Sequence, residues 1–331
     1  MLKKFRGVFV TLMASTVIGV CSSRWLIIWV CLEINTLAIC WIITKDSKQE
    51  KQKETATFIY FIIQVITSIL VIITALQQER LVSYLTIIII LIIKIGVWPI
   101  HIWYIKLINS LEIKQPSMMV VITWQKILPI ILIIRIREKI NIKIILTLLV
   151  VSTLVTPITN LIKELSIKRI IALSSFNNNA WLLVSASTSL LTFSCFLTLY
   201  ASTLIVTLKR MWIITKKTEK IILPFWSSIL VVRNIGGLPP LTMFWSKILV
   251  VKSIIRATIP TEMSLILIIT ACYFLYHYLW ITLNETSWTP NKMQHSTNKQ
   301  TIQLTSIITT TRVAGIILLV TLGLTQRDLS W

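Results

Sequence analysis

The sequence predicts an all-α, polytopic membrane protein that forms a single membrane domain over residues 1–331. Hydrophobic residues make up 55% of the 331 and charged residues only 14%, and the mean hydropathy is +0.82. Apolar runs of about 18 residues or more recur along the chain, and each can cross about 30 Å of hydrocarbon as a helix. Helices satisfy their own backbone groups in lipid, and the sequence lacks the two-residue alternation of a membrane β-barrel.

Each apolar run predicts one transmembrane helix, and charged or polar loops set most of the boundaries. In chain order the runs predict about eleven helices, at residues 5–22, 24–44, 55–77, 81–105, 117–134, 144–162, 168–187, 189–208, 221–250, 262–282 and 304–325. The loops are short, and the longest polar connection is Asn284–Lys299. No separate soluble domain is therefore expected.

The net charge of +21 would indicate nucleic-acid binding in a soluble protein. Here the basic residues lie mostly in short loops, which is how membrane proteins set their orientation. Basic patches with interleaved aromatic residues are absent, so nucleic acid is not an expected partner. The N-terminal side of the predicted helices holds roughly twice as many basic residues as the other side, which predicts an inside N-terminus, although the loop Arg135–Lys143 opposes it.

The five cysteines all lie in apolar segments. None forms a CxxC pair or lies near a histidine in sequence, so no metal or iron–sulfur site is expected in this chain. The cysteines are best interpreted as small buried hydrophobes.

Several charged residues fall inside the predicted helices. A lysine at the bilayer centre costs at least about 2.5–3.5 kcal/mol, and such residues usually face the bundle interior and mark an ion path. A lysine near a helix end can instead extend to the interface. That alternative fits Lys247, near the end of its run, better than Lys94, roughly 20 Å of helix from Arg80, or the central Lys126. The roles of Arg233 and Arg312 are left open.

Two of the predicted helices are interrupted beside a lysine. Pro99 follows Lys94, and Gly236, Gly237, Pro239 and Pro240 precede Lys247. Such breaks are tolerated at membrane depth where the freed backbone groups are buried or line a cavity. The broken helices are the fourth and the ninth, and an offset of five predicts an inverted repeat with halves 1–143 and 144–282 and an extra helix at 304–325.

Glu33 and His101 are the other ionisable candidates. Glu33 is the one acid well inside a predicted helix. It could stabilise a protonated Lys94, or it could be neutral and hydrogen-bonded. His101, close to the break after Lys94, could extend a proton relay or serve in packing. A lysine that changes surroundings can take up and release a proton, because burial and a neighbouring carboxylate shift its pKa in opposite directions.

The stretches "WVCLEINTLAI", "KIGVWPIHIW", "TWQKILP" and "NIGGLPPLTMFWSK" together resemble the mitochondrial NADH dehydrogenase subunit 2 family, the antiporter-like membrane subunits of respiratory complex I. The resemblance implies proton translocation through Glu33, Lys94, Lys126 and Lys247, in the mitochondrial inner membrane, with the N-terminus on the matrix side. It implies other membrane-arm subunits and lipids as partners. NADH, FMN, iron–sulfur clusters and ubiquinone would be bound by partner subunits.

The chain departs from the family pattern at four positions. They are Lys106, where an acid is usual; Asn178, where a histidine is frequent; Arg233, where an apolar residue is expected; and His277, where an arginine is frequent. The residues leave two alternatives open. One is a stand-alone cation/proton antiporter of the same fold, and the other is a structural subunit whose buried charges are inert.

Overall fold

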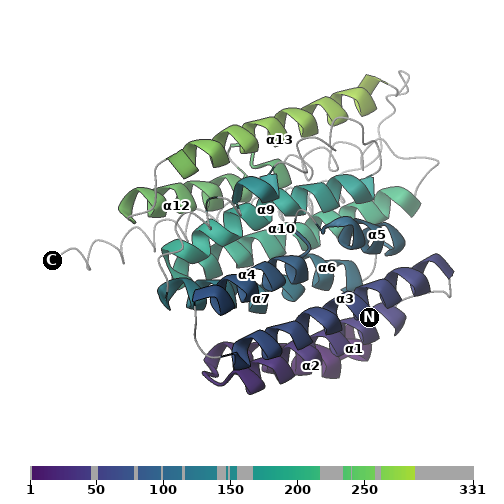
Figure 1. Ribbon diagram of the computed structural model, residues 1–331. Helices are drawn as coiled ribbons and strands as arrows, with labels where there is room; N and C mark the ends of the chain where they lie inside the picture. Colours follow the sequence, from purple (N-terminus) through teal and green to yellow (C-terminus); the bar gives the residue numbers. More distant parts are fainter. Residues whose placement is uncertain are drawn as a thin grey trace. The chain divides into compact units, whose positions relative to one another are not determined.

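A computed structural model describes residues 2–45, 51–77, 81–97, 100–113, 116–139, 147, 150–154, 167–216, 234–239, 241–257 and 262–287. Every regular element in these ranges is an α-helix (Figure 1), which confirms the predicted all-α class. Within them, five helical stretches are long and apolar enough to cross a membrane: 25–45, 51–76, 116–136, 190–209 and 262–279. The predicted helix 304–325, most of 144–162 and the first part of 221–250 lie outside the described residues.

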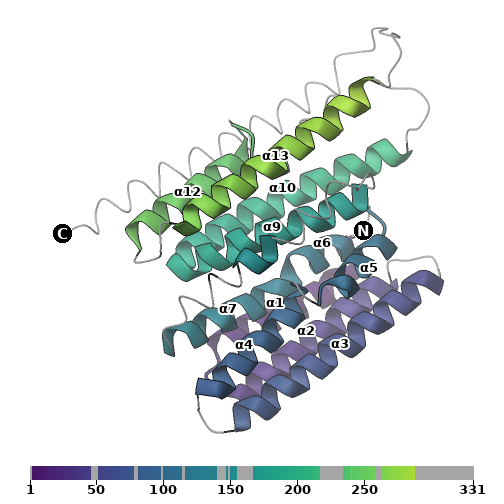
Figure 2. The same ribbon diagram turned by 45° about the horizontal axis from the view of Figure 1, so that its top comes forward.

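The chain divides into two compact units, and the first holds residues 1–160 and 164–186. Its helices are α1 (Leu2–Cys21), α2 (Trp25–Lys45), α3 (Lys51–Leu76), α4 (Leu81–Ile95), α5 (Ile102–Ser110), α6 (Pro116–Ile122), α7 (Trp124–Lys139) and most of α9 (Ile167–Thr188). Helices α1, α2 and α3 lie side by side, and α3 packs against α4 and α5 (Figures 1 and 2). Helix α7 contacts α1, α2, α4 and α6, and α2 contacts α1, α3, α6 and α7, so these two helices join most of the unit.

Helix α3 shows how the sequence directs its faces. Its buried positions recur every three or four residues and include Tyr60, Gln64, Thr67 and Ser68. Its exposed positions include large aliphatic residues such as Ile66 and Ile73. A soluble helix has the opposite arrangement, with its apolar stripe inside. In a bilayer the apolar face of a helix meets the lipid chains, so the polar residues of α3 turn toward neighbouring helices.

The break in the predicted helix 81–105 is present. Helix α4 ends at Ile95, Gly96 adopts a positive φ of 83°, and α5 begins at Ile102. A Cβ on Gly96 would lie 2.9 Å from Cζ2 of Trp103, so this turn needs glycine for both its conformation and its space. Pro99, to which the sequence assigned the break, lies outside the described residues.

Two boundaries differ from the sequence prediction. The predicted helix 117–134 is interrupted at Thr123, between α6 and α7, and continues to Lys139. Arg135 was expected in a loop, but it lies in α7 and its guanidinium donates to the backbone oxygens of Val20 and Ser22. These carbonyls belong to the end of α1, where they lack helical partners. Arg135 therefore caps a helix.

The second unit holds residues 161–163 and 187–331. Its long helices are α10 (Leu190–Lys216), α12 (Thr242–Arg256) and α13 (Glu262–Ser287), with α10 packed against α12 (Figure 2). A turn with Gly237 at φ 83° precedes α12, and a Cβ on Gly236 would lie 2.9 Å from the Tyr278 ring of α13. The single membrane domain with repeat halves 1–143 and 144–282 stays a prediction.

Candidate functional site

Glu33 and Lys94 lie on either side of the polar face of α3. Ser68 donates a hydrogen bond to the Glu33 carboxylate, and the Lys94 ammonium donates to the backbone oxygen of Gln64 at 3.0 Å. Gln64 and Ser68 are one helical turn apart. Lys94 is only 2% exposed. Among the described contacts no direct ion pair joins the two groups, and Glu33 acts on Lys94 electrostatically through space.

The backbone oxygen of Lys94, next to the break at Gly96, is held by side chains of two other helices. Gln64 of α3 donates to it at 3.1 Å, and Gln125 of α7 donates to it at 3.2 Å. An interrupted helix leaves carbonyls without their usual partners, and amides from the neighbours supply replacements. Lys94 is thus bonded to α3 through both its amine and its carbonyl.

Lys126 of α7 lies in a cage of neutral oxygens. It is 1% exposed, and its amine contacts the Tyr104 hydroxyl at 3.0 Å, the Asn179 side-chain oxygen at 3.1 Å and the Ser175 hydroxyl at 3.5 Å. The amine also lies 4.4 Å from the centre of the Tyr104 ring, a cation–π geometry. Helices α5, α7 and α9 build this cage.

Several amide atoms of α7 and α9 are buried with no hydrogen-bond partner in the part of the chain that the structure describes. They are Oδ1 of Asn177, Oδ1 of Asn178, Nδ2 of Asn179 and Oε1 of Gln125. A buried polar group left unpaired costs about 1–3 kcal/mol, and buried waters usually bind such groups. Asn179, whose Oδ1 contacts Lys126, therefore offers its Nδ2 as a group that can bind water beside the lysine.

In the second unit, Lys247 of α12 is bonded to the break that precedes it. It is 7% exposed, and its amine donates to the backbone oxygen of Gly236 at 2.9 Å. A Cβ on Gly237 would lie 3.0 Å from the same amine. The sequence left open whether Lys247 extends to the interface, and its burial favours an inward position.

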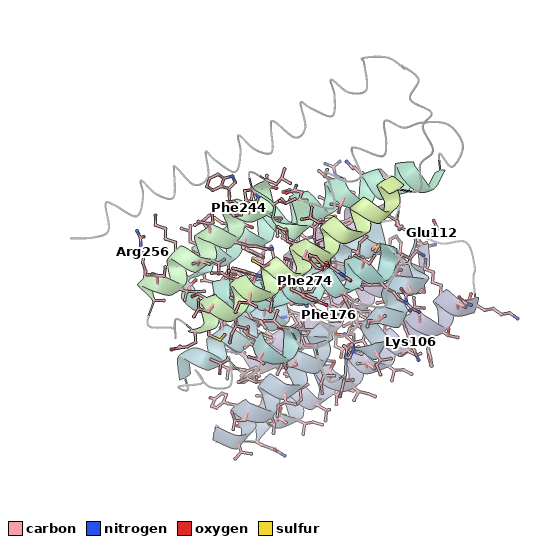
Figure 3. All side chains as sticks on the ribbon, turned by 90° about the horizontal axis from the view of Figure 1, so that it is seen from above. Lys106, Glu112, Phe176, Phe244, Arg256 and Phe274 are labelled. Carbon is pink, nitrogen blue, oxygen red and sulfur yellow. The ribbon has the colours of Figure 1, made fainter. Side chains whose placement is uncertain are left out.

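The remaining predicted site residues are less informative. His101 is half-buried just before α5, and its ring meets Phe176 edge to face, with centroids 5.8 Å apart; Phe176 is labelled in Figure 3. A relay role for His101 stays a prediction. Pro239 is exposed in the turn before α12, whereas Pro240 lies outside the described residues, as do Arg233 and Arg312.

Sequence reasoning missed the residues that bind Glu33, Lys94 and Lys126. They are Gln64, Ser68, Tyr104, Gln125, Ser175 and Asn179. One pattern could have indicated some of them, since Gln64 with Ser68 and Ser175 with Asn179 are polar pairs at i, i+4 inside apolar runs. Such a pair marks the helix face that turns away from lipid.

The chain is similar to one known family along most of its length. The family model described as "NADH:quinone oxidoreductase/Mrp antiporter, TM" matches residues 69–274. Among curated proteins, NADH-ubiquinone oxidoreductase chain 2 of Hylobates lar is 29% identical, covering 92% of this chain and 94% of its own. The chain 2 protein of Salmo salar is also 29% identical, covering 80% of each chain.

Two solved structures share the fold. A chain in the structure of respiratory complex I from Thermus thermophilus with bound aureothin superposes with a TM-score of 0.68 at 17% identity, covering 97% of this chain and 78% of that chain. A chain of the Mrp complex from Dietzia sp. DQ12-45-1b superposes with a TM-score of 0.71 at 13% identity, covering 88% of this chain and 61% of that chain.

Proposed function

Because this chain belongs to the NADH:quinone oxidoreductase/Mrp antiporter family of membrane subunits, we propose that it translocates protons as a membrane-arm subunit of respiratory complex I. The curated relatives are chains of NADH-ubiquinone oxidoreductase, an enzyme complex. We place this chain in the mitochondrial inner membrane with its N-terminus in the matrix. Partner subunits would carry NADH oxidation, FMN, the iron–sulfur clusters and ubiquinone, and this chain would convert their signal into proton movement.

The observation that carries the proposal is the burial of three lysines on uncharged oxygens. Lys94 donates to a backbone carbonyl of α3, Lys126 to hydroxyl and amide oxygens, and Lys247 to a carbonyl of the break before α12. An ammonium bound in this way is less strongly held than one in a buried ion pair, because a neutral oxygen attracts it less than a carboxylate does. For Lys94 and Lys126, this weaker hold permits the gain and loss of a proton that a relay requires.

Glu33 supplies a means of controlling the first lysine. Its carboxylate acts on Lys94 through space while Ser68 holds it in place. A negative charge near an ammonium favours its protonated form, so a change of charge near Glu33 would alter how firmly Lys94 keeps its proton. Movement of charge near Glu33, driven from a neighbouring subunit, is the input that this arrangement accepts.

Replacing single lysines with methionine tests the proposal, since methionine keeps most of the side-chain volume and removes the amine. We expect Lys126→Met, in the assembled complex, to lower the initial rate of proton translocation at least about tenfold, with assembly intact. Lys94→Met and Lys247→Met should act in the same direction. Lys106→Met is the matched control, because Lys106 is exposed on α5 (Figure 3). Wild-type translocation by Lys126→Met would leave the buried charges inert and defeat the proposal.

The second candidate function is a stand-alone cation/proton antiporter, which the shared fold with the Mrp chain favours. It predicts that the purified chain alone exchanges cations for protons in liposomes. Recovery of the chain only within a large NADH-oxidising assembly, with no exchange by the chain alone, decides against it. His101→Gln can be measured in the proton translocation assay of the assembled complex. If the imidazole of His101 takes part in the relay, this variant should translocate protons more slowly.

A further inference from the structure

The Tyr104 and Ser175 hydroxyls continue from Lys126 as an unbroken line of hydrogen bonds. Tyr104 lies 3.0 Å from the lysine amine, and its hydroxyl oxygen is 2.8 Å from that of Ser175, with either atom able to donate. The Ser175 hydroxyl in turn lies 2.7 Å from the backbone oxygen of Ala172. Tyr104 and Ser175 are both 0% exposed, so bulk water does not compete at either hydroxyl.

With the amine protonated, all the hydrogens point one way. An ammonium has three donors and no acceptor, whereas a hydroxyl has one hydrogen and can also accept. Lys126 donates to Tyr104, Tyr104 donates to Ser175, and Ser175 donates to Ala172. Each hydroxyl then gives one hydrogen bond. Tyr104 receives one from the amine, and Ser175 receives one from Tyr104 and a longer one from the amine. The charged form of Lys126 is satisfied by this arrangement together with Asn179.

With the Lys126 amine neutral, the hydrogen bonds between these groups must reverse their donor and acceptor roles. A neutral amine has two hydrogens and a lone pair, and the lone pair needs a donor. The Asn179 oxygen that contacts the amine cannot donate. The Tyr104 hydroxyl can turn its hydrogen to the lysine nitrogen, and Ser175 can then donate to Tyr104. Only two hydroxyl hydrogens rotate, and no heavy atom has to move. The Ala172 carbonyl keeps the backbone partner that its place in α9 provides.

We propose that Tyr104 and Ser175 form a reversible hydroxyl pair that positions Lys126 for proton transfer by satisfying both its charged and its neutral form. This inference rests on the proposed function, in which Lys126 gains and loses a proton. Tyr104 is the positioning residue closest to the amine, at 3.0 Å. Ser175 bonds to Tyr104 and makes a longer contact of 3.5 Å with the amine itself. The proton that Lys126 exchanges is not assigned to the tyrosine, because rotation of the hydroxyls reorders hydrogen bonds without breaking any O–H bond.

The decisive variant is Tyr104→Phe. Phenylalanine keeps the ring that packs against Trp103 and Phe176 and the ring face near the amine, and it removes only the hydroxyl. The matched control is Tyr60→Phe, because Tyr60 is also fully buried and its ring packs against Trp103, yet none of the described residues forms a hydrogen bond with its hydroxyl. We expect Tyr104→Phe to slow proton translocation by the reconstituted complex about fivefold or more, and Tyr60→Phe to leave it unchanged.

Rescue at Ser175 separates positioning from packing. Ser175→Ala should slow translocation less than Tyr104→Phe does, because Tyr104 still contacts the amine. Ser175→Thr, which keeps a hydroxyl, should restore the rate. Assembly of each variant is established first on native gels. If the assembled Tyr104→Phe complex translocates protons at the wild-type rate, the inference is wrong. It is also wrong if, of the variants Tyr104→Phe, Ser175→Ala and Asn179→Leu, only Asn179→Leu, which removes the amide contact to Lys126, slows translocation. If Lys126→Met itself keeps the wild-type rate, the proposed function fails instead.

Discussion

The helix breaks beside Lys94 and Lys247 share a glycine turn but differ in the hydrogen bonds that hold them. Gly96 and Gly237 share a positive φ of 83°, and at each break a buried lysine donates to a backbone oxygen. The break after α4 is held by amides from α3 and α7. Among the described contacts, the break before α12 is bonded within its own chain segment, since Thr242 donates to Asn234 across the turn at 3.0 Å, and Gly236 lies close to the Tyr278 ring of α13. The first break is therefore bonded to side chains of neighbouring helices, whereas the described bond at the second is local.

The largest effect should come from adding a methyl group at each glycine. At Gly96 the new Cβ would meet the Trp103 ring at 2.9 Å and the Cβ of Tyr104 at 3.1 Å, neither of which can move freely. At Gly237 it would meet the flexible end of Lys247. We expect Gly96→Ala to cost about 2–4 kcal/mol and Gly237→Ala about 1–2 kcal/mol.

The measurement is the thermal midpoint and the amount of assembled complex for each variant. Gly7→Ala is the control, since a Cβ there meets nothing within 4 Å. Equal losses at Gly96 and Gly237 would contradict the difference in support that the two breaks show.

A smaller effect should follow from removing the amides that hold the Lys94 carbonyl. Gln64→Leu or Gln125→Leu alone leaves one donor in place, so each should cost about 0.5–1.5 kcal/mol. The double variant leaves the carbonyl without either donor and should cost more than the sum of the two. Thr242→Val removes the bond across the other break and should cost about 1 kcal/mol. Additive losses in thermal stability for the glutamine pair would show that the two amides act independently.

The smallest effect should come from removing a serine hydroxyl near each of the two lysines. Ser68 donates to Glu33, so we expect Ser68→Ala to slow translocation about twofold to fivefold by loosening the carboxylate. Ser246 is equally buried next to Lys247, but its hydroxyl donates to Met243 of its own helix. Ser246→Ala should leave the translocation rate unchanged. A slower Ser246→Ala complex would indicate an acidic or wet partner at the second site.

Much of the fold follows from the sequence, because long apolar runs leave a membrane helix no alternative partner for its backbone. The buried positions of Lys94 and Lys126 follow from their distance to the nearest loop. The interruption at Thr123 does not, since threonine carries no helix-breaking signal comparable to glycine or proline. Arg135 looked like a loop residue because its partners, Val20 and Ser22, lie more than a hundred positions away.

The polar cage of Lys126 could be predicted only in part. The i, i+4 pair of Ser175 and Asn179 indicates which face of its helix turns inward, but serine, asparagine and tyrosine recur in many of the apolar runs, and the pair does not indicate which residues of other helices it meets. Only the packing of α5, α7 and α9 brings Tyr104, Lys126 and Asn179 to one point. Contacts of this kind depend on tertiary structure, which periodicity along a single helix does not encode.

Gln125 and Lys126 are consecutive residues of α7. The Gln125 amide bonds to the Lys94 backbone oxygen at the end of α4, and the Lys126 amine contacts hydroxyls of α5 and α9. Because α7 moves as a rigid helix, a tilt that withdraws the Lys126 amine from these hydroxyls also displaces the amide that bonds to Lys94. Under the proposed function, the positions of Lys94 and Lys126 are therefore coupled mechanically through α7.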